Sequence, residues 1–273
     1  MRLYISADLE GVAGVVSPRQ VTASAAYEEA RRWMTEEVCA VSRGALAAGA
    51  EKIVVNDGHL SMTNLLLDHL PEKVEVLSGR PKEWGMMCSI DKGFDLAFFV
   101  GYHARQGSLG LLSHSYSDAI ARIELNGIEV GELGFNAALA GFYGVPVGLV
   151  SGDAEVAVEG SHLVGTRFAV VKWPLSQQGA RTLLPQKSQA LLETHSYEVV
   201  RDWLSGENTV EAWCPGGPYQ LMVEFRHARM AQVVACMPGL TQRGPCRVEY
   251  SHQDLPTLYK AFQAMLLLAH SVA

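Results

Sequence analysis

Two carboxylates, Asp8 and Glu10, stand two residues apart directly after a short apolar stretch at residues 3–5. Side chains alternate between the two faces of a strand, so both acids point to the same side. Two like charges at the end of a buried strand are unfavourable unless a cation compensates them, and a divalent metal ion is the simplest such cation. The alternative is an exposed turn with two solvated acids, and the other polar residues of the chain decide between the two.

Two histidines and a third acid lie further along the chain at the ends of predicted strands or at the start of a predicted helix. His59 and His103 each follow a predicted buried strand, and Glu132 stands beside a predicted hairpin at the start of a helix. Ligand sites of open α/β sheets lie beyond the carboxyl ends of the strands, so these three residues should converge with Asp8 and Glu10. Each histidine taken singly is more often a hydrogen-bonded surface or core residue. Five such groups on one edge favour a metal site.

Three carboxylates and two imidazoles exceed the four ligands that one zinc ion normally takes. They suit a pair of ions bridged by one carboxylate, and we predict that Asp8 is the bridge. Such a centre activates a bound water and polarises a carbonyl or phosphoryl oxygen, so it predicts hydrolysis. Zinc, manganese and cobalt all accept a mixed carboxylate and imidazole set, so the ligands leave the metal open.

Three further residues adjoin this predicted site. His114 follows a loop that contains Gly107 and Gly110, where it could transfer a proton or stabilise an oxyanion without binding the metals. A loop histidine without a role is the alternative. We predict that Asp57 caps a turn or orients a ligand, and that Asp153 caps the N-terminus of a helix.

Composition narrows the class of protein. The 273 residues are 48% hydrophobic and 19% charged, with a formal net charge of −7 and no cluster of lysine or arginine. Nucleic acid and anionic membranes are therefore not expected partners. The five cysteines form no C-x-x-C pair, which argues against a disulfide framework and a thiolate zinc site. No signal-peptide pattern or membrane-length apolar run is present, so the chain is predicted to be cytoplasmic.

The first part of the chain alternates strand and helix patterns. Its apolar runs are continuous, which is typical of parallel strands covered on both faces. Asn126-Gly127 between two β-like runs predicts a hairpin. We therefore predict an α/β fold, with a doubly wound, mostly parallel sheet and an inserted β-hairpin. The predicted strands are residues 3–6, 52–56, 74–77, 95–100, 120–125, 128–130, 147–150 and 166–171, and the predicted helices are 25–48, 84–90 and 131–143.

The order of predicted helices and strands changes after about residue 180. A helix at 185–194, strands at 220–225 and 246–250 and a closing helix at 255–268 suggest a smaller α+β unit. We predict an α/β metal-binding catalytic domain at residues 1–180 and a smaller α+β domain at residues 181–273.

The chain resembles the DppA-type D-aminopeptidases, di-zinc metallopeptidases of the dipeptide transport operon type, over essentially its whole length. Several spaced motifs in the same order carry this resemblance. They are SADLEG at 6–11, VND at 55–57 with His59, Met62 and Asn64, GYHAR at 101–105, SHS at 113–115, GELG at 131–134 with Asn136, Gly152-Asp153, Val171-Lys172 and MPG at 237–239.

The resemblance implies a specific set of roles. In that family the positions matching Asp8, Glu10, His59, His103 and Glu132 bind two zinc ions, with the aspartate shared, and the position matching His114 is the proposed catalytic histidine. The family removes N-terminal D-residues from short peptides, and its type member forms stacked rings, which implies a ring-shaped homo-oligomer, a decamer. The resemblance assigns no secure role to Asn136, Lys172 or Asp153.

Two positions depart from the family pattern. Gly58 stands where relatives usually have serine, and Gln177 stands where an arginine is expected. Neither belongs to the inferred metal set, but both bear on substrate contacts, and so on peptide length and the choice between D- and L-residues.

These observations predict a cytoplasmic di-metal aminopeptidase that hydrolyses N-terminal residues, D-residues by resemblance, from short peptides through a metal-activated water. A di-metal phosphoesterase is one alternative, since the same ions serve phosphoryl chemistry, although the chain has no basic phosphate-binding cluster. A metal-dependent module that binds dipeptides without cleaving them is the other.

Overall fold

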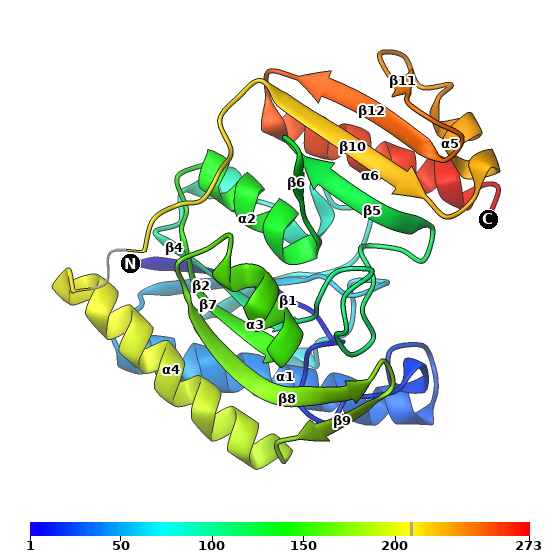
Figure 1. Ribbon diagram of the computed structural model, residues 1–273. Coiled ribbons are helices and arrows are strands. Elements are labelled where there is room, and N and C mark those ends of the chain that lie inside the picture. The colour runs from blue at the N-terminus through cyan, green and yellow to red at the C-terminus, as the bar shows by residue number, and fades with distance from the viewer. Residues whose placement is uncertain (208–209) are drawn as a thin grey trace.

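Seven strands form the larger of two sheets in the computed structural model, which describes residues 1–207 and 210–273 (Figure 1). The strand order is β3-β2-β1-β4-β7-β8-β9, and all neighbours are parallel except β8 and β9. This arrangement confirms the predicted doubly wound α/β fold. The strands are β1 (Arg2–Ala7), β2 (Lys52–Asp57), β3 (Val74–Leu77), β4 (Leu96–Tyr102), β7 (Val147–Asp153), β8 (Arg167–Ser176) and β9 (Gly179–Thr182).

The strand order reverses between β1 and β4. The chain runs outward from β1 through β2 to β3, and then returns to β4 on the opposite side of β1. Ala7, the last residue of β1, is in register with Asp57 of β2 and Val100 of β4. The segments that leave these three strands therefore start at nearly the same level, and a doubly wound sheet opens a crevice at such a reversal.

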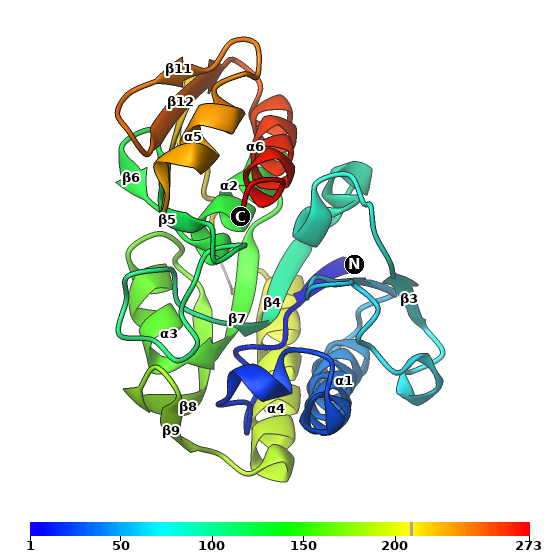
Figure 2. The ribbon, with the colours of Figure 1, turned by 90° about the vertical axis from the view of Figure 1, so that its right-hand side faces the viewer.

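Helices cover both faces of this sheet. On one face α1 (Ala25–Ala47) and α4 (Pro185–Ser205) pack side by side, and on the other lie α2 (Glu132–Phe142) and α3 (Ala154–Ser161) (Figures 1 and 2). Successive side chains of β1 point to opposite faces of the sheet, so this strand contributes to both cores. Leu3 and Ile5 join the core under α1 and α4, while Tyr4 joins the core on the other face.

A second, antiparallel sheet has the order β11-β12-β10-β5-β6. Alternate residues of β10 are buried, and α5 and α6 pack against this sheet, with α6 also contacting α2 (Figure 2). None of the helices formed by the described residues has the length and apolarity that a membrane-spanning helix needs. The elements are β5 (Ile120–Leu125), β6 (Ile128–Glu129), β10 (Tyr219–Phe225), β11 (Thr241–Gln242), β12 (Arg247–His252), α5 (Ala228–Val234) and α6 (Leu255–His270).

The predicted hairpin is present as β5 and β6, and its turn residues Asn126 and Gly127 both have a positive φ, as two-residue hairpin turns require. The hairpin pairs with β10 rather than with the large sheet. Helix α4, predicted to end at residue 194, continues to Ser205 and packs on α1. The hairpin from before residue 180 therefore joins the second sheet, and α4 from after it joins the large sheet's helices. The division into two domains at residue 180 stays a prediction.

The helix predicted at residues 84–90 is absent as a continuous helix. Two short 3₁₀ turns replace it, because Trp84 and Ser89, which precede them, adopt left-handed backbone angles that interrupt helical hydrogen bonding. Sequence patterns predicted only the start of α3, at Asp153, and gave no prediction for α5, β9 and β11, which are all short. The residues that the structure describes form four 3₁₀ turns, which are η1 (Pro18–Gln20), η2 (Leu67–His69), η3 (Gly85–Met87) and η4 (Ile90–Lys92).

Candidate metal centre

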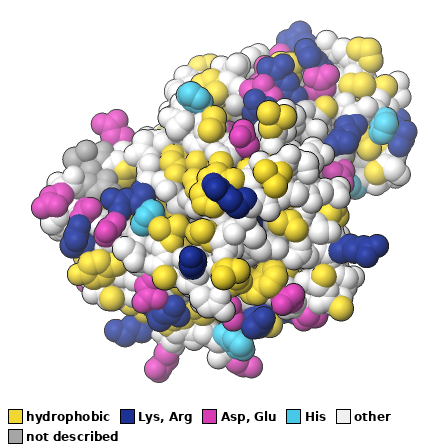
Figure 3. Space-filling model, turned by 60° about the horizontal axis from the view of Figure 1, so that its bottom comes forward, with side chains coloured by type: hydrophobic (Ala, Val, Ile, Leu, Met, Phe, Trp, Pro, Cys, Tyr) yellow, Lys and Arg dark blue, Asp and Glu magenta, His cyan; other side chains and the backbone are white. Residues whose placement is uncertain are grey.

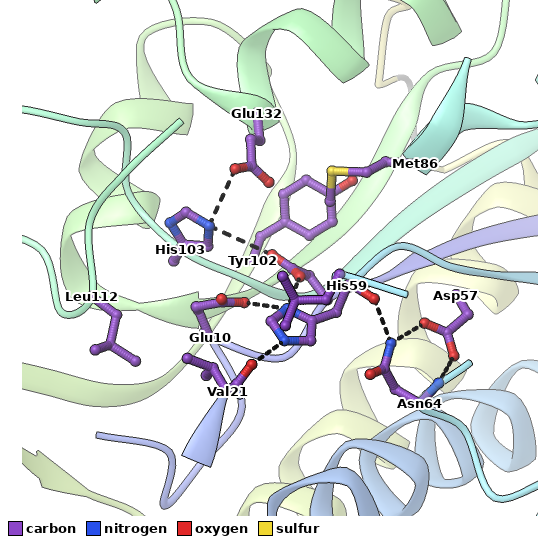
Figure 4. A network of polar contacts seen from close by, with 12 residues as sticks. Glu10, Val21, Asp57, His59, Asn64, Met86, Tyr102, His103, Leu112 and Glu132 are labelled. Carbon is purple, nitrogen blue, oxygen red and sulfur yellow. Dashed lines mark hydrogen bonds and ion pairs between the residues drawn. The ribbon is translucent and has the colours of Figure 1, made fainter. Parts of the chain in front are cut away.

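The five predicted ligand side chains meet in the crevice at the carboxyl ends of the central strands. Asp8 and Glu10 follow β1, His59 follows β2, His103 follows β4, and Glu132 begins α2. None of the five exposes more than 5% of its surface. Figure 4 shows Glu10, His59, His103 and Glu132 turned toward one another. The predicted convergence of these residues is therefore what the fold produces.

Asp8 lies at the middle of this cluster. Its Oδ1 is 3.5 Å from Nδ1 of His59, and its Oδ2 is 3.6 Å from Nε2 of His103. Glu10 Oε2 lies 3.0 Å from the same nitrogen of His59, and Glu132 Oε1 lies 3.5 Å from the same nitrogen of His103. The cluster therefore has two halves, each with one imidazole and one carboxylate, and Asp8 faces both.

Several buried polar atoms of this cluster have no hydrogen-bond partner among the described residues. They are Oδ2 of Asp8, Oε2 of Glu10 and Nε2 of His103. A buried polar atom without a partner costs about 1–3 kcal/mol, and more if it is charged. Ligand atoms of these three residues lie within 4.8 Å of one another. Oxygen and nitrogen donors at this spacing fit zinc ions, which would supply the partners that these atoms lack.

Hydrogen bonds to backbone carbonyls fix the imidazole rings. Nε2 of His59 donates to the carbonyl oxygen of Val21 at 2.8 Å, and Nδ1 of His103 donates to that of Ala104 at 3.0 Å. These bonds fix which nitrogen of each ring faces the carboxylates, and this nitrogen must lose its proton before it can bind a metal ion. Such bonds orient imidazoles for metal binding and raise their basicity.

The buried charges strongly perturb one another when no metal is bound. Burial, and then the charge of Glu10, raises the pKa of Asp8 to about 6. Burial alone would also raise the pKa of Glu10, but His59 outweighs it and holds that pKa well below its usual range. Burial opposes protonation of His103, yet Glu132 and Asp8 raise its pKa to about 10. Protonated imidazoles thus compensate the carboxylates in the metal-free protein.

Zinc binding to the metal-free protein at pH 8 should therefore release about two protons, one from each imidazole, because a ligating nitrogen must be unprotonated. The pKa of His103 is raised to about 10, and the carboxylates of Glu10 and Asp8 hold the pKa of His59 well above its usual value in spite of burial. At pH 6 Asp8 is half protonated and should add about half a proton. Calorimetric titration in two buffers with different ionisation enthalpies measures the count. Zinc binding without proton release at pH 8 would contradict this charge assignment.

His114 lies at the rim of the cluster. Its ring stacks on that of His103, with centroids 4.3 Å apart and planes 9° apart, and its Nε2 is 3.8 Å from Oε1 of Glu132. Its side chain is 25% exposed, far more than the five central residues. This position gives it access both to the cluster and to solvent.

Asp57 is not part of the cluster. Its carboxylate accepts hydrogen bonds from the backbone N–H groups of Asn64 and Leu65, at 2.5 and 2.9 Å. The side-chain amide of Asn64 in turn donates to the carbonyl oxygen of His59 at 2.6 Å. Asp57 thus caps the turn that follows His59, which confirms the prediction for this residue.

Sequence reasoning gave no role to Lys172, which is fully buried near the middle of β8. Its ammonium group donates to the carbonyl oxygens of Glu10, Val12 and Val15, the last two at 3.0 and 2.7 Å. Burial lowers its pKa to about 8. The lysine thus holds the loop that carries Glu10, and the only sequence signal was a charged residue directly after the apolar run at residues 168–171.

Replacement of Lys172 with methionine should lower the free energy of unfolding by about 3 kcal/mol or more, because three carbonyl oxygens lose their donor. It should also weaken zinc binding about tenfold, as the loop of Glu10 loosens. Urea denaturation and competition with a chelator measure the two effects. Lys52→Met is the matched control, since this half-exposed lysine pairs with Glu75 at the surface. Equal effects in both variants would refute the assignment.

Asn136 is the hub of a buried polar network behind the cluster. Its side-chain amide donates to the hydroxyl of Tyr102 at 2.9 Å and accepts from those of Tyr116 and Tyr259, at 2.8 and 2.6 Å. The backbone N–H of Tyr116 donates to Oε1 of Glu132 at 2.6 Å. The network thus ties α2 and α6 to the strand that carries His103.

Comparison with known proteins assigns the family. A sequence profile of the D-aminopeptidases matches residues 1–264. The chain is 34% identical to the D-aminopeptidase of Bacillus subtilis (strain 168) over 271 residues, 98% of this chain and 96% of the relative. It also superposes on the structure of the Zn-dependent D-aminopeptidase DppA from Bacillus subtilis, a self-compartmentalizing protease, with a TM-score of 0.94, 33% identity and coverage of 99% and 98%. This chain therefore belongs to the D-aminopeptidase family.

Proposed function

We propose that the chain is a di-zinc aminopeptidase that removes N-terminal D-residues from short peptides. The observation that carries the two-ion proposal is the position of Asp8, whose two carboxylate oxygens each face an imidazole nitrogen. The similar solved structure is described as a Zn-dependent D-aminopeptidase, which supports zinc and the substrate class. Glu10 and His59 would hold one ion, Glu132 and His103 the other, and Asp8 both.

Zinc ions in these positions would supply Lewis-acid polarisation of the scissile carbonyl and a water activated for attack. The protein contributes the rest of the chemistry. The buried cluster excludes bulk water from the reacting groups, which strengthens their electrostatic interactions. His114, at the solvent-facing rim, is placed to move a proton to the leaving amine through Nε2.

A homo-oligomer, ring-shaped and decameric as in the resemblance, is part of this proposal, as is a cytoplasmic location. The similar structure is described as self-compartmentalizing. Leu109 and Leu175 are 83% and 80% exposed, which suits contacts with further subunits. Figure 3 shows one face of the molecule, on which apolar side chains gather near the middle and charges of both signs are interspersed. Light scattering on the purified protein measures the mass.

A panel of paired D- and L-dipeptides and phosphoesters tests the proposal, with product release measured for the zinc-loaded and the chelated protein. We expect release of the N-terminal residue from D-dipeptides only with zinc. Phosphate release would favour the phosphoesterase, and binding without product would favour the dipeptide-binding module. The family assignment favours neither of these two alternatives.

A further inference from the structure

Asp153 joins the large sheet to the loop that carries His114. It ends β7 and is fully buried. One carboxylate oxygen accepts a hydrogen bond from the N–H of Val156 at 2.8 Å and caps α3, as the sequence predicted. The other accepts from the N–H of Leu111 at 2.7 Å, in the segment between β4 and β5. This second contact has no part in capping the helix.

The contact continues through the backbone to the ring of His114. The next residue, Leu112, has a left-handed backbone with φ of +54°, which a bulky residue adopts only where its surroundings hold it. Its N–H donates to the carbonyl oxygen of Gln177 at 2.9 Å. Its own carbonyl oxygen accepts from Nδ1 of His114 at 3.0 Å, so the backbone that Asp153 and Gln177 hold also aims this ring.

Close packing leaves little freedom at this contact. A Cβ atom at Gly110 would lie 2.6 Å from Cβ of Ala104 and 3.2 Å from Oδ2 of Asp153, so the loop backbone rests on the carboxylate. The side chain of Leu111 is fully buried. Lys172 is in register with Asp153 on β8 and places a cation beside the buried carboxylate.

We propose that Asp153 is a positioning residue for catalysis, which holds the segment at Leu111 and Leu112 so that Nε2 of His114 faces the metal centre. A hydrogen bond to a carboxylate is about twice as strong as one between neutral groups, which suits a fixed loop. Displacement of a catalytic group by about 1 Å can reduce the rate about a hundredfold. The inference rests on the proposed catalytic role of His114.

Asp153→Asn and Asp153→Ser test this inference, because both residues cap helices well but neither offers Leu111 a carboxylate. We expect kcat to fall about 10- to 100-fold, with KM and zinc content within about twofold of the wild type. The amides of Leu111 and Leu112 should exchange with deuterium faster. Asp254→Asn is the matched control, since Asp254 caps α6 through Thr257 and should leave all these values unchanged.

A double-mutant cycle separates positioning from a general structural effect. If Asp153 acts through His114, Asp153→Asn should lower the residual rate of the His114→Ala variant less than twofold. Unchanged kcat in either folded Asp153 variant, loss of zinc, or misfolding of both would overturn the inference. Wild-type turnover of His114→Ala would instead refute the proposed role of His114.

Discussion

Replacement of Asp8 with asparagine is expected to remove both zinc ions and to reduce turnover by at least about a thousandfold. Each oxygen of Asp8 faces a different imidazole nitrogen, at 3.5 and 3.6 Å. Asparagine offers one neutral oxygen, so it cannot serve both halves of the cluster as an anion. Metal analysis of the purified variant and rates with D-dipeptides measure the two effects.

The same substitution should not destabilise the metal-free protein, although it removes zinc binding. The pKa of Asp8 is raised from 3.8 to about 6 in the folded protein, so the fold loses stability as the pH rises through this interval, and the whole cost is present above it. At pH 8 the ionised carboxylate costs on the order of 3 kcal/mol. Urea denaturation with a chelator present should therefore find the Asp8→Asn variant at least as stable as the wild type.

Asp118→Asn is the control for Asp8, because Asp118 is an exposed acid outside the cluster and should change neither zinc content nor rate. Full zinc occupancy in the Asp8 variant would refute the bridging role. Loss of only one ion would place Asp8 in one half of the cluster.

Replacement of His114 with alanine is expected to reduce kcat about 10²- to 10⁴-fold, the range for loss of a general acid or base. Zinc content should remain that of the wild type, since the side chain lies at the rim and contacts the cluster by stacking on His103. Atomic emission analysis and steady-state kinetics on the same sample separate the two properties.

The same experiment distinguishes a catalytic from a ligating role for His114. His103, His114 and Glu132 also have ligand atoms within 4.8 Å of one another, so His114 is close enough to bind a metal. Loss of zinc in proportion to activity would make it a ligand. His162→Ala, at an exposed position after α3, is the matched control and should leave both values unchanged.

The position of the cluster followed from local patterns in the sequence. Apolar runs of strand length, followed at once by Asp8, His59 and His103, were enough to predict a parallel sheet with polar groups at one edge. That inference works because parallel strands bring their carboxyl ends to the same edge whatever their order. The family motifs also assigned Glu132 and His114 to the site. Neither residue directly follows a strand, so its position relative to the other ligands depends on the path of the loops.

Contacts between elements far apart in the chain could not be predicted from the sequence. The hairpin at residues 120–129 was recognised from Asn126 and Gly127, but its partner β10 lies about ninety residues later. The contact of α4 with α1 is of the same kind. Such pairings depend on which buried surfaces fit together, and no local pattern encodes that fit.

The sequence by itself determined the chemistry of this protein, because the types and spacing of the acids and histidines limit which ions and reactions they support. Only the tertiary structure decided what the buried Lys172 does, and what Asp153 does besides capping α3. Lys172 donates to the carbonyl oxygen of Glu10, and Asp153 accepts from the N–H of Leu111. Both contacts are with backbone groups of loops far away in the chain. Every residue other than proline has the same backbone N–H and carbonyl groups, so the sequence does not indicate which of these groups a buried charge will contact.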